Sequence, residues 1–305
     1  MTTIKNKIQK REILKSYYTP DHSKKLIREC NIPYNDQDKI KYDYREVSLL
    51  KQNEFSFRGI TFSYSEYMNK IIFNPNPDYP YSVLNNNSNI YISKARLKYS
   101  LPRFSFKSSE RSIQTKPFYQ HEYINYIRYM DIYLDFDIDN YKDIPYLIHD
   151  INYFIELLSE YKLMFEVVFS GNRGFKILLY NNYYTLEGVS KLIFDLTLNK
   201  YVKDHIKYLD HTCTYSIPSK LMKMNFTLCH SNETLNYVFP LKKQNYKNVF
   251  SRILKDNNFT IFNYTNESIN NLCRDINYTS FFNDEFTYSD RRLIKFVKDL
   301  NIKII

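Results

Sequence analysis

Two aspartates, Asp135 and Asp137, are the residues of this chain best placed to do chemistry. They belong to the stretch Asp131–Asp139 (DIYLDFDID), in which apolar and acidic residues alternate, as they do in a half-buried strand. Side chains two positions apart share a face, ~6–7 Å apart along the strand, and two carboxylates repel by roughly 3 kcal/mol at ~5 Å and an effective dielectric of ~20. A divalent cation between them reverses this repulsion, and oxygen ligands suit Mg²⁺ or Mn²⁺. The alternative is an edge strand with a solvated acidic face.

A second candidate group lies in the turn Ser170–Gly174 (SGNRG), between two apolar strands. The chain contains four glycines, and two of them are in this turn, where small residues let the backbone approach a ligand. Backbone N–H groups, a serine hydroxyl and a guanidinium can all bind phosphate oxygens. The predicted phosphate-binding residues are Ser170, Gly171, Asn172, Arg173 and Lys176, the last on the same strand face as Gly174. A tight hairpin with an exposed arginine is the alternative.

A third candidate group begins at Asp210, a carboxylate at the end of a short apolar strand. Asp210 is the candidate third metal ligand, and the residues that follow it, Lys223 and His230, are candidates for holding a triphosphate that the metal neutralises. Each of the three has an ordinary alternative: a turn cap for the aspartate, a solvated surface position for the lysine and a hydrogen-bonded strand residue for the histidine.

The order of these groups resembles the archaeo-eukaryotic primase superfamily, in particular the small catalytic subunit of primase. That family has a DxD motif, an SGxRGxH-type motif, and a lone aspartate followed by Lys or Arg and then His. The resemblance covers residues 131–240, and Glu54–Phe57 (EFSF) is similar to an element near the start of these primases. The string GNRGF and the run Asn140–Asp143 (NYKD) are further similar to the late-expression-factor-type primases of large insect DNA viruses.

The resemblance implies an α/β (α+β) fold with a split, RRM-like sheet that carries the three motifs on one face. It implies two-metal nucleotidyl transfer, with Mg²⁺ or Mn²⁺ held by Asp135, Asp137 and Asp210 as metal ligands and catalytic residues. Ser170, Arg173, Lys223 and His230 would hold the incoming nucleoside triphosphate, and the product would be a short primer on a single-stranded DNA template. A primase large subunit or a helicase-like protein is the implied partner.

The chain departs from the family pattern at several points. Lys176 stands where the family has His, and a lysine binds phosphate as a point charge but accepts protons poorly near neutral pH. Asn172 replaces the usual first arginine of the turn, and the spacing from Lys223 to His230 is longer than expected. No cysteine lies within 138–163, so no structural zinc is expected. The change at Lys176 favours the alternative that the protein is a catalytically inactive, RRM-like module that binds single-stranded nucleic acid.

The composition agrees with a polyanionic partner, because the net charge is +10 and the isoelectric point is about 9.1. The 31 Tyr and 22 Phe suit base stacking, although an AT-rich genome explains most of them. Four cysteines without zinc spacing predict reduced thiols. We therefore expect an intracellular protein, in the nucleus or cytoplasm of a host, that is neither secreted nor inserted in a membrane.

The elements that must position these residues follow from periodicity. We predict a catalytic domain over residues 1–245, with a helical and hairpin N-terminal part, and a helical extension over 246–305. Predicted strands are 54–57 and 60–64, joined by a turn at Arg58–Gly59, then 90–93, 131–137, 164–169, 175–180, 226–230 and 236–240. Predicted helices are most of 1–50, then 143–161, 185–203, 246–255 and 287–301.

Overall fold

The computed structural model of this chain describes residues 45–51, 54–65, 70–74, 90–93, 95–99, 101, 122–130, 132–163, 165–179, 206–210, 221–225, 227–231, 234–241, 246–259 and 295. Helices and antiparallel sheets are combined in them, so the fold class is α+β, as predicted. The predicted helix over 185–203 and most of 287–301 lie outside the described residues. None of the described helices is long and apolar enough to cross a membrane.

The aspartate stretch forms β7 (Ile132–Asp137), at one edge of a four-stranded sheet. Its neighbour is β9 (Gly174–Leu179), followed by β8 (Phe165–Phe169) and β13 (Phe239–Leu241). Both β7 and β8 run antiparallel to β9 and therefore parallel to each other, and the helix α5 (Ile144–Glu160) connects them. This arrangement is a split βαβ unit, in which a third strand inserts between the two parallel strands. The sequence prediction of these three strands and this helix is confirmed.

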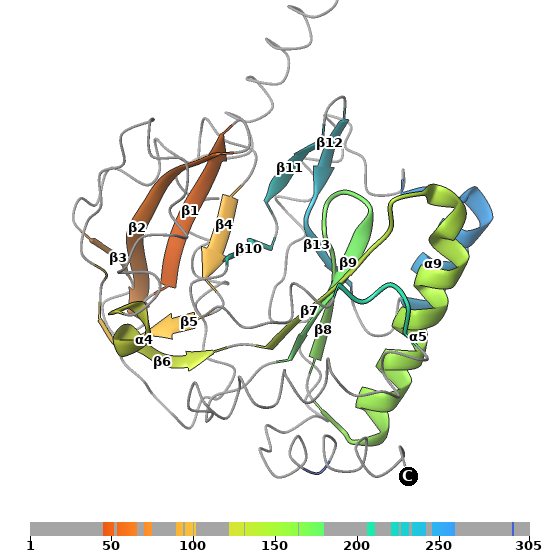
Figure 1. The fold of residues 1–305 in the computed structure, drawn as a ribbon, viewed down its shortest axis with the longest axis horizontal. Helices are drawn as coiled ribbons and strands as arrows, with labels where there is room; N and C mark the ends of the chain where they lie inside the picture. Colours follow the sequence, from red (N-terminus) through yellow and green to blue (C-terminus); the bar gives the residue numbers. More distant parts are fainter. Residues whose placement is uncertain are drawn as a thin grey trace, which may run out of the picture.

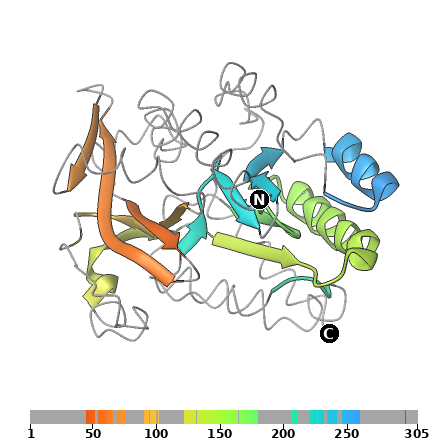
Figure 2. The same ribbon diagram turned by 90° about the horizontal axis from the view of Figure 1, so that it is seen from above.

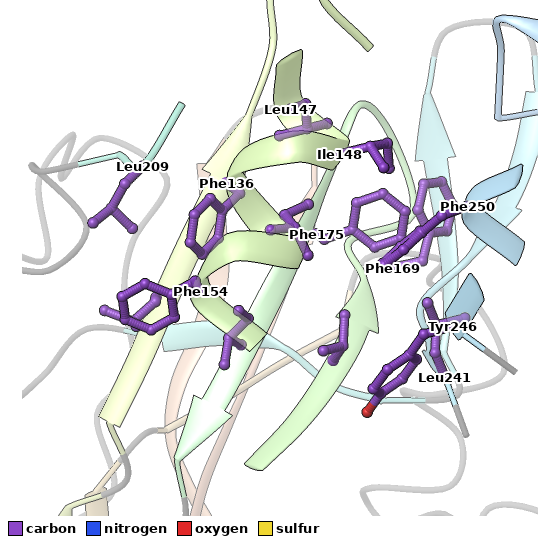
Figure 3. Close-up of a cluster of buried hydrophobic side chains, with 14 of the residues drawn as sticks. Phe136, Leu147, Ile148, Phe154, Phe169, Phe175, Leu209, Leu241, Tyr246 and Phe250 are labelled. Atoms are coloured by element: carbon purple, nitrogen blue, oxygen red, sulfur yellow. The ribbon is translucent and has the colours of Figure 1, made fainter. Parts of the chain in front are cut away.

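The core lies between this sheet and two helices. Alternation along β7 directs Leu134 and Phe136, both fully buried, toward α5, where the Phe136 ring lies 5.9 Å from the Phe154 ring. The second helix, α9 (Tyr246–Asp256), lies beside α5, and its Phe250 ring contacts the Phe175 ring of β9 at 5.5 Å (Figures 2 and 3). The odd-numbered residues of β7 therefore face away from the helices.

The start of α5 is fixed by a cap and a proline. The side chain of Asn140 accepts a hydrogen bond from the Lys142 backbone N–H at 3.0 Å and opens a single 3₁₀ turn, Tyr141–Asp143. Pro145 sits in the first helical turn, where no backbone donor is needed. The sequence predicted that Asp143 caps the helix; Asp143 occupies the N-cap position, but its side chain makes no capping hydrogen bond.

A second sheet has five strands in the order β10-β4-β1-β2-β3, and every neighbouring pair is antiparallel. Its strands are β1 (Arg45–Lys51), β2 (Glu54–Ser65), β3 (Lys70–Asn74), β4 (Ile90–Ser93) and β10 (Leu221–Lys223). Figure 1 shows β10 at the edge of this sheet that lies nearest to the four-stranded sheet. The predicted strand over 90–93 is confirmed.

Two predictions about this sheet are wrong. Residues 45–51 form a strand and not the end of a helix, because both edges of β1 are paired, with β2 and with β4. The turn predicted at Arg58–Gly59 is part of the continuous strand β2. There the register moves from Val47↔Ile60 to Leu49↔Phe57, so β2 has one extra residue, which is a β-bulge.

The remaining described strands form two short pairs. One pair joins β5 (Ala95–Leu97) to β6 (Ile127–Met130), which follows the short helix α4 (Tyr123–Tyr126). The other is the hairpin of β11 (Leu228–Ser231) and β12 (Thr234–Tyr237). The strands predicted at 226–230 and 236–240 thus divide into β11, β12 and β13, because a turn and a bridge to β8 interrupt the second run.

Candidate active site

The two aspartates of β7 share the face of the sheet that is opposite α5. Burial, followed by the charge of Asp135, raises the pKa of Asp137 to about 6 from the ordinary 3.8. Although much of the surface of Asp137 is exposed, its carboxyl group is surrounded closely enough by protein atoms to be partly desolvated. Asp135 is half-buried, and its Oδ1 atom is shielded from solvent. The charge of Asp135 thus adds to the effect of burial on Asp137, and their role as metal ligands stays a prediction.

The turn Ser170–Gly174 lies directly against this pair. Its ends are closed by a hydrogen bond from the Ser170 N–H to the Gly174 oxygen at 2.9 Å, and Gly171 has a φ of 84°, a conformation that favours glycine. Gly174 pairs with Asp137 across the strands. A Cβ atom at Gly174 would collide with the backbone oxygen of Phe136 and with the Asp137 carboxylate. The glycine therefore lets the turn and the aspartate strand approach one another.

Within the turn, Ser170 and Gly171 are buried and Asn172 and Arg173 are half-buried; the contacts of Arg173 are with the residues that follow β7. The Arg173 backbone oxygen accepts a hydrogen bond from the Ile138 N–H at 3.4 Å. The Arg173 guanidinium donates to the backbone oxygen of Asp139 at 3.2 Å and lies 3.7 Å from its carboxylate. Asp139 is a contact that sequence reasoning missed: it continues the alternation of Asp135 and Asp137, but it matches no motif position.

Two lysines from different sheets meet beside the pair. Lys176 of β9 lies opposite Asp135 in register, is almost fully buried, and donates from Nζ to the backbone oxygen of Lys223 at 3.5 Å. Lys223 of β10 donates from its own Nζ to the backbone oxygen of Ser170 at 3.2 Å. The charges of Lys223, Lys176 and Arg173 all act to lower the pKa of Asp137. Three predicted phosphate-binding cations thus gather around one predicted metal ligand.

The segment that contains Asp210 lies along the free side of β7. Leu209 forms an isolated antiparallel bridge with Phe136, and the Asp137 N–H donates to the Tyr208 oxygen at 3.2 Å. The Asp210 backbone N–H donates to the Asp135 backbone oxygen at 2.7 Å, so the third predicted aspartate is next to the first in space. Among the described residues, however, no group of three or more His, Cys, Asp or Glu side chains is placed to hold a metal ion. The role of Asp210 as a third ligand stays a prediction.

Only the backbone of His230 belongs to the described part of the structure. Its backbone belongs to β11, where it pairs with Leu235 of β12, and its side chain lies outside the described part. Its predicted contact with a triphosphate therefore stays a prediction.

The donor set fits a hard divalent cation better than a transition metal with nitrogen or sulfur ligands. The carboxylates of Asp135 and Asp137 supply only oxygen, which suits Mg²⁺ or Mn²⁺. Both the burial of Asp137 and its repulsion by Asp135 disfavour its charged form, and a bound cation would offset both effects. The two carboxylates of β7 are therefore the residues that would hold the metal.

No protein-family model matches this sequence, and no curated protein matches it. Among solved structures, the chain is similar to the polymerase domain of Mycobacterium tuberculosis ligase D in complex with DNA. The sequence identity is 11%, the TM-score is 0.39, and the match covers 72% of this chain and 84% of that one. At this level of similarity the likeness supports no conclusion about the function of the chain.

Proposed function

We propose that this chain is the catalytic subunit of a DNA primase, a template-directed nucleotidyltransferase that makes short primers on single-stranded DNA. One observation carries the proposal: the carboxylate pair of β7 faces three cations from the SGNRG turn, β9 and β10. Nucleotidyl transfer needs this combination, because carboxylates hold the metal while cations hold the phosphates that the metal bridges.

Asp135 and Asp137 would hold Mg²⁺ or Mn²⁺, with Asp210 as the third ligand. When bound, the metal supplies neutralisation of phosphate charge and activation of the attacking hydroxyl. The strand geometry does the positioning: β7 is paired with β9 along its whole length, so the carboxylates are presented by a rigid element.

Two of the three cations, Arg173 and Lys223, would bind the triphosphate of the incoming nucleotide. Arg173 can offer two parallel N–H groups to phosphate oxygens, and Lys223 has an amine that now donates to a backbone oxygen of the same turn. Lys176 is too buried for a mobile ligand and instead contributes a fixed positive charge beside Asp137. The net charge of +10 supports binding of the template backbone.

The proposal is tested by nucleotide incorporation on a single-stranded poly-pyrimidine template, with labelled ribo- and deoxyribonucleotides, with and without a primer. We expect incorporation that depends on Mg²⁺ or Mn²⁺, and its loss in Asp135→Ala with Asp137→Ala while template binding persists. Glu156→Ala is the matched control, because Glu156 is an exposed carboxylate on α5. A wild-type protein that binds the template but incorporates nothing, even onto a primer, would instead be a nucleic-acid-binding module.

A further inference from the structure

Asp150 is a buried carboxylate for which the proposed chemistry has no use. It lies on α5, is 5% exposed, and faces the segment 206–210. Its Oδ2 atom accepts two hydrogen bonds, from the backbone N–H of Lys207 at 2.8 Å and of Tyr208 at 2.9 Å. Its Oδ1 atom lies 3.5 Å from Nδ1 of the exposed His149. A buried carboxylate with this many donors is a specific anchor for the chain that it holds.

The anchored segment connects Asp150 directly to the aspartate strand. After Lys207 and Tyr208, Leu209 forms its single bridge with β7, and the Asp210 N–H donates to the Asp135 oxygen. The side chain of Leu209 is buried in the same core as Phe136 and Phe154 (Figure 3). Four consecutive residues, 207–210, therefore connect a carboxylate of α5 to the carboxylate pair of β7.

An isolated bridge specifies register weakly. A shift of one residue along β7 would turn every side chain of the segment to the opposite face, so Asp210 would leave the face of Asp135. The two hydrogen bonds that Asp150 Oδ2 accepts oppose this shift, because the Lys207 and Tyr208 backbone N–H groups would both lose their acceptor. The buried Asp150 carboxylate would in turn lose its two backbone donors, which is unfavourable for a charged group shielded from solvent.

We propose that Asp150 is a positioning residue, which fixes the register of residues 207–210 so that Asp210 lies beside Asp135. The inference rests on the proposed function in one respect only, namely that Asp210 serves the metal site. The contact itself, and its effect on the segment, can be measured without catalysis.

The test compares Asp150→Ala and Asp150→Asn with wild type and with His149→Gln, a control that alters only the neighbour of Oδ1. Amide hydrogen exchange reports on the segment directly. For Asp150→Ala we expect the amides of Lys207, Tyr208 and Asp210 to exchange about ten- to a hundredfold faster, while the amides of β9 stay protected. Asp150→Asn keeps a neutral acceptor, so its exchange should lie between wild type and Asp150→Ala.

Binding of Mn²⁺, measured by calorimetry without nucleotide, is the second readout. We expect weaker Mn²⁺ binding in Asp150→Ala, partial rescue in Asp150→Asn and no change in His149→Gln. Unchanged exchange of the three amides, or Mn²⁺ affinity that follows only the folded fraction, would overturn the inference. A wild type that incorporates no nucleotide would refute the proposed function, whereas these two measurements would still decide the role of Asp150.

Discussion

The buried amine of Lys176 donates a hydrogen bond to the backbone oxygen of Lys223 at 3.5 Å, and this bond joins the four-stranded sheet to the five-stranded sheet. The return contact runs from the Lys223 amine to the backbone of the SGNRG turn. The two lysines of the site therefore come from strands of different sheets, β9 and β10, and the charge balance of the site depends on a lysine that solvent hardly reaches.

Removal of the Lys176 charge should shift the neighbouring carboxylate. In Lys176→Met, Asp137 loses one of the cations that lower its pKa, so we expect that pKa to move above about 6. Carboxyl carbon NMR titration measures the shift directly. Loss of a fixed charge at the site should also lower kcat/KM about ten- to a hundredfold. An unchanged Asp137 titration would contradict the proximity of the two charges; Lys142→Met, at an exposed position, is the control.

The free energy of unfolding of the metal-free protein should depend on pH through the titration of Asp137. Because its folded pKa is about 6 and its ordinary value 3.8, the folded state binds more protons than the unfolded state between these values. The contribution of this carboxyl to the free energy of unfolding is thus fully present below pH 3.8, declines as the pH rises, and is lost above about pH 6. Asp137→Asn should remove this decline and raise the Tm at pH 7.

The measurement is thermal unfolding in a chelator at a series of pH values, for wild type and Asp137→Asn. The difference in Tm between the two should grow from pH 4 to pH 6 and then level off, in line with the pKa of Asp137. A difference that is constant across this range would mean that Asp137 has an ordinary pKa.

A methyl group at Gly174 should damage both fold and site. In Gly174→Ala the new Cβ collides with the Phe136 backbone oxygen, which cannot move away without disturbing the pairing of β7 and β9, and it displaces the Asp137 carboxylate. We expect a loss of more than about 2 kcal/mol in the free energy of unfolding, measured with denaturant. Asn172→Ala, in the same turn, should cost much less, and a similar loss in both variants would argue against the close approach.

Substitutions of Arg173 and of its partner Asp139 should have very different effects on the KM for the triphosphate. Their ion pair is exposed, and such pairs contribute about 0.2–1 kcal/mol, so Asp139→Ala should change the KM for the triphosphate by less than about fivefold. Arg173→Ala removes a proposed phosphate ligand and should raise that KM by more than about tenfold. Steady-state kinetics of both variants decide between them; equal effects would assign the carboxylate of Asp139 to the site.

The elements around the site follow from local sequence patterns. Apolar residues at helical spacing, among them Leu147, Ile151, Phe154 and Leu158, predict α5, and all four are buried in the core. Alternation predicts β7 and directs Asp135 and Asp137 to one face. Scarcity of glycine identifies the SGNRG turn, and the collision at Gly174 gives the physical reason why glycine is needed there.

Contacts between segments that are far apart in the sequence could not be predicted from local patterns. Lys176 and Lys223 are 47 residues apart, and Asp150 and Lys207 are 57 apart, so no local period indicates that either pair meets. The strand β2 is a second case in which contact with a distant segment decides the local structure. Arg58–Gly59 has the composition of a turn, but pairing with β1 turns it into a bulge.

The aromatic contacts behind the SGNRG turn bear on how this protein can be shortened. Phe169 and Phe175, which flank the turn, are covered by Phe250 of α9 and by Phe259, with ring separations of 5.5 Å for Phe175 to Phe250 and for Phe169 to Phe259. A fragment that ends at residue 245 would lack Phe250 and Phe259. It would therefore expose the rings of Phe169 and Phe175 and remove the packing next to the turn. The smallest fragment worth expressing therefore extends at least to residue 259.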